Sequence, residues 1–121
     1  YSEVAVRIVR KYGGLFICDE VQTGFGRTGD HWCGISHWGV EPDIMTFAKS
    51  IANGFPVGAT IATAEVADAF TGLTISTFGG SPITMSATEA TLDVMEREDT
   101  PKRSAAGGQQ LRSHLLGVRD K

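Results

Sequence analysis

Apolar residues near the start of the chain change from a helical spacing to an unbroken run. From Val4 to Tyr12 they recur at every fourth position, which predicts the end of an amphipathic helix. Two glycines at positions 13 and 14 then end this helix in the manner of a C-cap. Residues 15–18 are all apolar, as in a short strand buried on both faces of a parallel sheet. A helix, a glycine break and an apolar strand together predict half of an α/β unit.

The rest of the chain predicts a long loop followed by alternating short strands and helices. Residues 22–42 lack periodicity and are rich in glycine, and a loop of that length inside a compact domain usually has a function. Pro101 is the predicted domain boundary. The further predicted elements are strands over 44–48 and 58–63, a short helix over 64–70, a helix with Ser81 as its N-cap and Pro82 at its first position, and a last helix after Pro101.

Length and charge exclude several classes of protein. The 121 residues are one domain's worth of chain and carry a formal net charge of −3. Nucleic acid is therefore not the expected partner, because it requires a basic face. No apolar stretch approaches the roughly 20 residues that a membrane-spanning helix needs, so no membrane partner is expected. The chain starts inside a periodic pattern, without Met or an apolar leader, so we expect it to begin in the middle of a protein.

The cysteines and histidines do not form a metal-binding pattern. Cys18 and Cys33 are far apart in the sequence, and no C-x-x-C pair is present. His31, Cys33 and His37 offer three ligands, but tryptophans interrupt them and no fourth ligand follows. We therefore predict no metal site and a buried Cys18 that acts as a small hydrophobic residue. Since nothing requires an oxidising compartment, the expected location is the cytoplasm, or the mitochondrial matrix in a eukaryote.

Two nucleotide-binding interpretations fail on their context. Residues 24–29 satisfy G-x-G-x-x-G, but four residues separate them from the preceding strand and no helical period follows. Residues 15–20 look like a Walker B strand, with four apolar residues before Asp-Glu. The phosphate-binding G-x-x-x-x-G-K-[ST] that must accompany such a strand is not encoded in this chain.

A carboxylate and a lysine follow two successive predicted strands. Asp19 ends the first strand and Lys49 ends the second. Because ligands of open α/β sheets bind outside the carboxyl ends of the strands, both groups would face one crevice. Pyridoxal phosphate chemistry needs this pair: the lysine carries the cofactor covalently, and the acid pairs with its pyridinium nitrogen. Each residue taken alone also has a structural explanation, since Asp19 could cap a turn and Lys49 could extend into solvent.

Three motifs add a resemblance to a known family. Residues 14–29, which include Asp19, closely resemble the cofactor-strand signature of class III, omega-type aminotransferases. Residues 42–56 look like that family's lysine segment, and residues 77–80 look like its phosphate loop. The motifs follow the family's order and approximate spacing and cover nearly the whole chain. Within the family, the resemblance leans toward the alanine–glyoxylate type.

The resemblance implies a fold and a domain organisation. The expected fold is α/β, a segment of the large domain of a fold type I pyridoxal-phosphate-dependent transferase, with mainly parallel strands flanked by helices. Residues 1–100 would belong to the cofactor-binding large domain, and residues 101–121 would start the C-terminal small domain. Ser81 stands where the family commonly has Asn after the glycines.

The resemblance also assigns roles to residues. Asp19 would bind the pyridine nitrogen, Val21 would pack on one ring face, and Gln22 would approach the phenolic oxygen of pyridoxal 5'-phosphate. Lys49 would hold the cofactor covalently and then act as general base and acid. Thr77 would bind the cofactor phosphate of the neighbouring subunit, which implies a homodimer. In the loop after Asp19, Glu20 would be a supporting polar contact, and Arg27 would be a scaffold ion-pair partner rather than a substrate ligand.

The implied activity is transfer of an amino group from a small amino donor to a 2-oxo acid. Other class III chemistry, such as aminomutation or decarboxylation, and a non-catalytic truncated fragment stay open as alternatives. The family's N-terminal phosphate turn, its second stacking aromatic residue and its substrate-binding arginine are not identified in this chain. We therefore expect the isolated 121 residues to lack aminotransferase activity.

Overall fold

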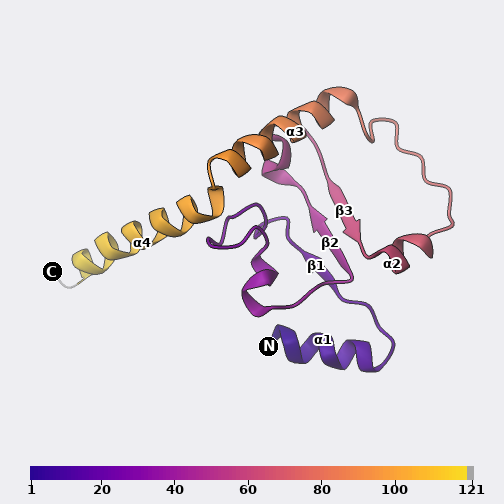
Figure 1. Ribbon diagram of the computed structural model, residues 1–121, viewed down its shortest axis with the longest axis horizontal. Coiled ribbons are helices and arrows are strands. Elements are labelled where there is room, and N and C mark those ends of the chain that lie inside the picture. Colours follow the sequence, from indigo (N-terminus) through magenta and orange to yellow (C-terminus); the bar gives the residue numbers. More distant parts are fainter. Residues whose placement is uncertain (120–121) are drawn as a thin grey trace.

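A short three-stranded sheet with helices at both of its ends forms the body of the computed structural model, which describes residues 1–119 (Figure 1). Among these residues, no helix is long and apolar enough to cross a membrane. The elements are α1 (Ser2–Lys11), β1 (Ile17–Asp19), the 3-10 helix η1 (Gly34–Trp38), β2 (Ile44–Phe47), the 3-10 helix η2 (Lys49–Ala52), β3 (Ala59–Ala62), α2 (Ala64–Asp68), α3 (Pro82–Arg97) and α4 (Thr100–Arg119).

The sheet is mixed, in the order β1-β2-β3. Strands β1 and β2 are parallel, with Asp19 opposite Thr46, whereas β2 and β3 are antiparallel, with Thr46 opposite Thr60. The connection from β2 to β3 spans only residues 48–58, and a parallel pair needs a longer crossover, usually through an α-helix. The predicted α/β class is confirmed, and the antiparallel β3 makes the sheet mixed rather than mainly parallel.

Strand β1 lies at an edge of the sheet and is not buried on both faces. Ile17 is 58% exposed and Leu15 is 55% exposed, so the prediction of a doubly buried strand is wrong for the residues described. The physical reason is that β1 is an edge strand, because β2 is the one strand among residues 1–119 that pairs with it. Cys18 is likewise only partly buried.

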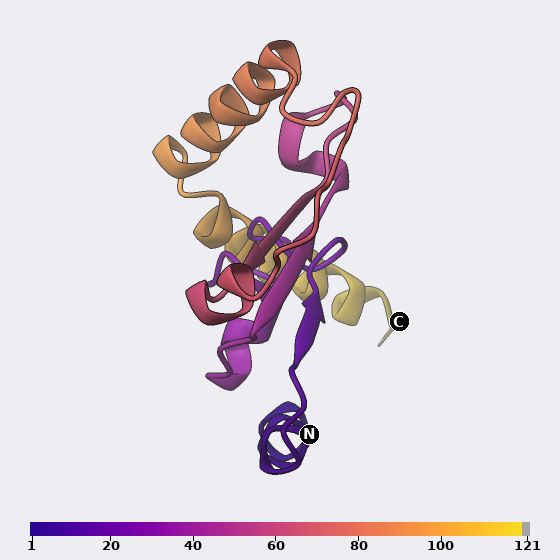
Figure 2. The ribbon, with the colours of Figure 1, turned by 90° about the vertical axis from the view of Figure 1, so that its right-hand side faces the viewer.

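Asp43 ties α1 to the start of the two parallel strands. Its Oδ1 accepts a hydrogen bond from Arg10 at 2.9 Å, and its Oδ2 accepts the backbone N–H of Phe16 at 2.7 Å. These donors, the N–H of Phe16 first, lower the pKa of Asp43 below its usual value. Arg10 also donates to the carbonyl of Glu41 at 2.7 Å. Figure 2 shows the result, with α1 at one end of the strands and α3 at the other.

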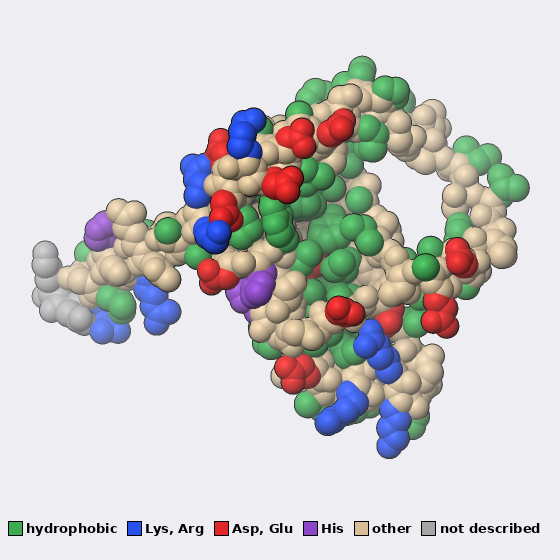
Figure 3. Space-filling model, viewed as in Figure 1, with side chains coloured by type: hydrophobic (Ala, Val, Ile, Leu, Met, Phe, Trp, Pro, Cys, Tyr) green, Lys and Arg blue, Asp and Glu red, His purple; other side chains and the backbone are tan. Residues whose placement is uncertain are grey.

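The hydrophobic core lies between the end of β2, η2 and α3. Phe47, Ile51 and Ala52 are its buried members. Figure 3 shows hydrophobic side chains gathered between α3 and the strands. Helix α3 starts as predicted, with Ser81 as N-cap and Pro82 in its first turn. The core therefore sits directly beneath the segment that follows β2, where Lys49 lies.

Helix α4 begins at Thr100, next to the predicted boundary at Pro101, which is buried. Figure 1 shows α4 projecting away from the sheet. Assignment of residues 101–121 to a second domain stays a prediction, and its positions 120 and 121 lie outside the described residues.

Candidate active site

The parallel pairing of β1 and β2 brings the ends of both strands to one edge of the sheet. Asp19 is the last residue of β1 and lies in register with Thr46 of β2. Lys49 lies two residues after Phe47, the last residue of β2. The two residues that the strand-end argument singled out therefore leave the same edge of the sheet on neighbouring strands.

Among residues 1–119, hydrogen bonds reach only one oxygen of the Asp19 carboxylate. Oδ1 accepts the backbone N–H of Val21 at 3.0 Å and the hydroxyl of Thr46 at 3.4 Å. Within residues 1–119, no hydrogen bond reaches Oδ2. The bond from Val21 makes Asp19 a turn-capping residue, and its exposed position leaves the second oxygen open to a ligand.

The backbone of Lys49 adopts a left-handed conformation, with φ of 56°. Lysine rarely occupies this region, because its Cβ is crowded there, and such strain costs about 1–3 kcal/mol. Lys49 starts η2, and the following residues Ile51 and Ala52 are anchored in the core. The core thus holds the strained turn in place, while the lysine side chain itself stays exposed.

Three of the predicted site residues line one cavity. A cavity of about 440 Å³ is lined on one side by the β1–η1 loop, which includes Val21 and Gln22, and on the other by Lys49 and Ser50. Asp19 is not part of the lining of this cavity, but it directly precedes the loop that forms one wall.

Thr77 does not lie at this cavity. It belongs to an exposed segment between α2 and α3, and its neighbours Ser76 and Phe78 line a separate cavity against Pro56 and Gly58. Its predicted role at a neighbouring subunit therefore stays a prediction.

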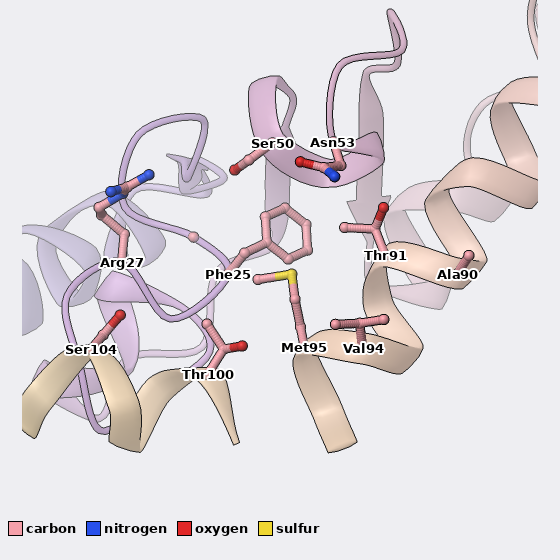
Figure 4. A pocket seen from close by; sticks show the side chains of 11 residues that line it. Phe25, Arg27, Ser50, Asn53, Ala90, Thr91, Val94, Met95, Thr100 and Ser104 are labelled. Atoms are coloured by element: carbon pink, nitrogen blue, oxygen red, sulfur yellow. The ribbon is translucent and has the colours of Figure 1, made fainter. Parts of the chain in front are cut away.

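A second, larger cavity of about 560 Å³ adjoins the first. Figure 4 shows Phe25 and Met95 next to each other in the middle of this cavity, with Arg27 to one side. Arg27 lines both cavities, is exposed, and forms no ion pair with any residue in the range 1–119. Because no carboxylate of residues 1–119 forms an ion pair with Arg27, its expected role as a scaffold ion-pair partner stays a prediction.

The carboxylate of Glu20, next to Asp19, is the most buried charged group at the site, with 1% of the residue exposed. Its Oε2 accepts hydrogen bonds from Thr23 Oγ1 at 2.6 Å and from the N–H of Gly34 at 2.9 Å. Its Oε1 accepts the N–H of Ile35 at 2.7 Å and Cys18 Sγ at 3.6 Å. Glu20 therefore joins the start of the loop that follows β1 to the first residues of η1.

These hydrogen bonds decide the ionisation of Glu20 and Cys18. Burial by itself raises the pKa of Glu20, but the hydrogen bonds, led by those of Thr23 and Ile35, outweigh it and lower the pKa below 4.5. Burial, followed by the nearby Glu20 charge, raises the pKa of Cys18 to about 11. At neutral pH, Cys18 is a thiol that donates to an ionised Glu20.

Close packing of the loop depends on two glycines. A Cβ at Gly24 would lie 2.8 Å from the Glu20 carbonyl oxygen and 3.1 Å from the ring of Phe47. A Cβ at Gly34 would lie 2.7 Å from Thr23 Cβ. The ring of Phe25 packs against that of Phe47 with centroids 5.2 Å apart. The G-x-G-x-x-G run is thus part of a packed structural loop that holds one wall of the cavity.

His31 and His37 meet edge to face, with ring centroids 4.7 Å apart. His37 Nε2 also lies 3.0 Å from the hydroxyl of Thr28. No group of three metal-binding side chains gathers within residues 1–119.

Two residues at the site were not found from the sequence. Thr46 contacts Asp19 across the parallel pair, and Ser50 lines both cavities beside Lys49. The signal for Thr46 was a polar residue inside the apolar run 44–48, in register with the end of the preceding strand. Ser50 carried no comparable signal beyond its position after Lys49.

Comparison with known proteins assigns the chain to a family and to a fold. The family model described as "Aminotransferase class-III" matches residues 1–121. The mitochondrial alanine–glyoxylate aminotransferase 2 homolog 2 of Arabidopsis thaliana is 43% identical over 100% of this chain and 25% of its own length. An acetylornithine aminotransferase of Archaeoglobus fulgidus is 48% identical over 87% of this chain and 28% of its own length.

Solved structures give the same result. An S-selective transaminase from Arthrobacter sp. superposes with a TM-score of 0.91 at 35% identity, over 99% of this chain and 26% of its own. An Arthrobacter phospholyase in complex with phosphoethanolamine superposes with a TM-score of 0.93 at 38% identity, over 100% of this chain and 29% of its own. The chain thus spans about a quarter of the length of the curated relatives it matches.

We expect Glu20→Gln to destabilise the full-length protein that carries this chain. The amide would place an N–H group against backbone N–H donors, so the free energy of unfolding should fall by about 2 kcal/mol in urea denaturation at pH 7. Because the folded-state pKa of Glu20 is lowered, its stabilisation exists above pH 4.5 and is lost as pH falls through the lower folded value.

The difference in the free energy of unfolding between Glu20→Gln and the unmodified protein should therefore become smaller as the pH falls. Glu65→Gln on exposed α2 is the matched control, with an expected change below about 0.5 kcal/mol. Equal stability of Glu20→Gln and the unmodified protein at pH 7 would contradict the role of Glu20.

Proposed function

This chain belongs to the class III aminotransferase family, and we propose that it forms the cofactor-binding centre of an enzyme that transfers an amino group from an amino donor to a 2-oxo acid. The observation that carries the proposal is the placement of Asp19 and Lys49 at the ends of adjacent parallel strands. A carboxylate and an amine at one sheet edge provide the two groups that pyridoxal phosphate chemistry requires.

The residues at this edge fit pyridoxal phosphate, the cofactor of class III aminotransferases. The open Oδ2 of Asp19 suits a protonated ring nitrogen, and the exposed Lys49 amine suits an aldehyde carbon. Val21 offers an apolar side chain for a ring face, and Gln22 offers an amide for a phenolic oxygen, on the same cavity as Lys49. The chemistry of these groups therefore matches a charged, aromatic, aldehyde-bearing ligand.

Lys49 moves the proton in the proposed reaction. When bound, pyridoxal phosphate supplies a ring that accepts electrons from the substrate. Lys49 Nζ, once free, would take the proton from the substrate Cα as general base and deliver it as general acid to the C4′ carbon of the cofactor. The carboxylate of Asp19 would stabilise a positive charge at the ring nitrogen of bound pyridoxal phosphate.

The strained backbone of Lys49 fits this role. A left-handed lysine persists only where its surroundings fix it, and such outliers cluster at functional sites. Here the core residues Ile51 and Ala52 hold the turn, so the amine is presented from a rigid position beside the cavity.

We further propose a homodimer in which Thr77 binds the cofactor phosphate of the partner subunit. Thr77 lies away from the Lys49 cavity of its own chain. Its neighbour Phe78 is 85% exposed and Ile75 is 90% exposed, which suits a segment that packs against another surface. These observations support the interface role that the family resemblance implies.

The proposed substrate pair is a small amino acid and a 2-oxo acid, with a lean toward the alanine–glyoxylate type. Relatives from Arabidopsis and human carry that name, whereas archaeal and bacterial relatives are acetylornithine aminotransferases. The two named alanine–glyoxylate relatives are mitochondrial, so the proposed location is the cytoplasm, or the mitochondrial matrix in a eukaryote.

Borohydride reduction of the full-length protein loaded with pyridoxal phosphate should fix the pyridoxyl group on Lys49. The reason is that Lys49 is the lysine beside the cavity and the predicted point of covalent attachment. Peptide mapping by mass spectrometry identifies the labelled residue. Lys102→Arg is the matched control and should label like the unmodified protein, whereas a label on any other lysine would refute the assignment.

Asp19→Asn should reduce the transamination rate by about a hundredfold while cofactor still attaches to Lys49. A neutral amide no longer stabilises the charged ring nitrogen, and loss of one such electrostatic contact typically costs this much or more. The measurement is the formation of the new amino acid from alanine and glyoxylate, with Asp68→Asn on α2 as control. Near-normal turnover of Asp19→Asn would show that Asp19 is not the ring partner.

The same assay tests the reaction type. Release of inorganic phosphate from phosphoethanolamine without amino transfer would contradict the transaminase proposal, since a structurally similar protein is a phospholyase.

A further inference from the structure

Thr46 is joined to both acidic residues at the end of β1. Its hydroxyl donates to Asp19 Oδ1 at 3.4 Å, and its carbonyl accepts the backbone N–H of Glu20 at 3.0 Å. It lies directly opposite Asp19 in the parallel register and is half-buried. No other side chain among residues 1–119 donates a hydrogen bond to Asp19.

The bond from Thr46 restricts the rotation of the Asp19 carboxylate. The last torsion of an aspartate has a broad, twofold energy profile, so a single donor leaves the carboxylate plane poorly defined. Val21 donates from the chain after β1, whereas Thr46 donates from β2, and both reach the same oxygen. Two donors from different segments fix Oδ1 and leave Oδ2 as the oxygen that faces a ligand.

We infer that Thr46 is a positioning residue for cofactor binding, and that its hydroxyl holds the Asp19 carboxylate so that Oδ2 receives a protonated ring nitrogen. The inference rests on the proposed function. Thr46 lies three residues before Lys49 in the chain, and Phe47 between them is buried in the core. One short segment therefore sets the orientation of the carboxylate and the position of the amine.

Thr46 also has an ordinary structural role, because a β-branched residue suits a strand. Thr60 provides the comparison: it lies opposite Thr46 in the antiparallel pair and has the same β-branched side chain. It is exposed and makes no side-chain hydrogen bond with residues 1–119. A substitution at Thr60 therefore measures only how a change of side chain within this pair of strands affects the protein, without the contact to Asp19.

The test is the dissociation constant of pyridoxal phosphate for the full-length apoprotein, followed by visible absorbance. Thr46→Val should raise this constant about fivefold, the effect of one modest hydrogen bond to a charged group. Thr46→Ser keeps the hydroxyl and should stay within about twofold of the unmodified protein, as should Thr60→Val. In an Asp19→Ala background, Thr46→Val should cause no further change, since the acceptor is gone.

Equal loss in Thr46→Ser and Thr46→Val would overturn the inference, as would a fivefold effect that persists in the Asp19→Ala background. Unchanged affinity in Thr46→Val would overturn it as well. In each case the unmodified apoprotein still binds cofactor, so the proposed function stands. If the unmodified apoprotein does not bind pyridoxal phosphate, the proposed function and the inference both fail.

Discussion

The buried carboxylate of Glu20 is the interaction on which the rest of the site depends. A charge taken out of water is costly unless hydrogen bonds compensate it, and Glu20 accepts hydrogen bonds on both oxygens. The donors come from β1, from the following turn and from η1, so one carboxylate closes the loop between them. Because Val21 and Gln22 follow Glu20 directly, this closure sets the wall of the cavity that faces Lys49.

The opposite wall depends on hydrophobic packing. Phe47, Ile51 and Ala52 hold the segment around Lys49 against α3, and Phe25 packs on Phe47 from the loop side. The loop that follows β1 and the segment around Lys49 therefore meet at the contact between Phe25 and Phe47. The hydrogen bonds of Glu20 hold the loop wall of the cavity, and the packing of Phe47 holds the wall at Lys49. Both walls contribute side chains to the proposed cofactor site.

Local patterns in the sequence predicted most elements and the positions of Asp19 and Lys49 relative to the strands. Spacing and capping signals located α1 and α3, and the expected placement of Asp19 and Lys49 at one edge of the sheet is confirmed. Tertiary features were not predictable in the same way. The direction of β3 depends on the length of its connection, and the exposure of β1 depends on which strands flank it. The hydroxyl contact of Thr46 with Asp19 depends on side-chain geometry that no spacing encodes.

A crystal structure of the full-length protein with pyridoxal phosphate tests the central claim most directly, namely that the ends of β1 and β2 form the cofactor site. We expect continuous electron density between Lys49 Nζ and the cofactor, and Asp19 Oδ2 within hydrogen-bond distance of the ring nitrogen. Cofactor bound away from these strand ends, or joined to a different lysine, would contradict the claim.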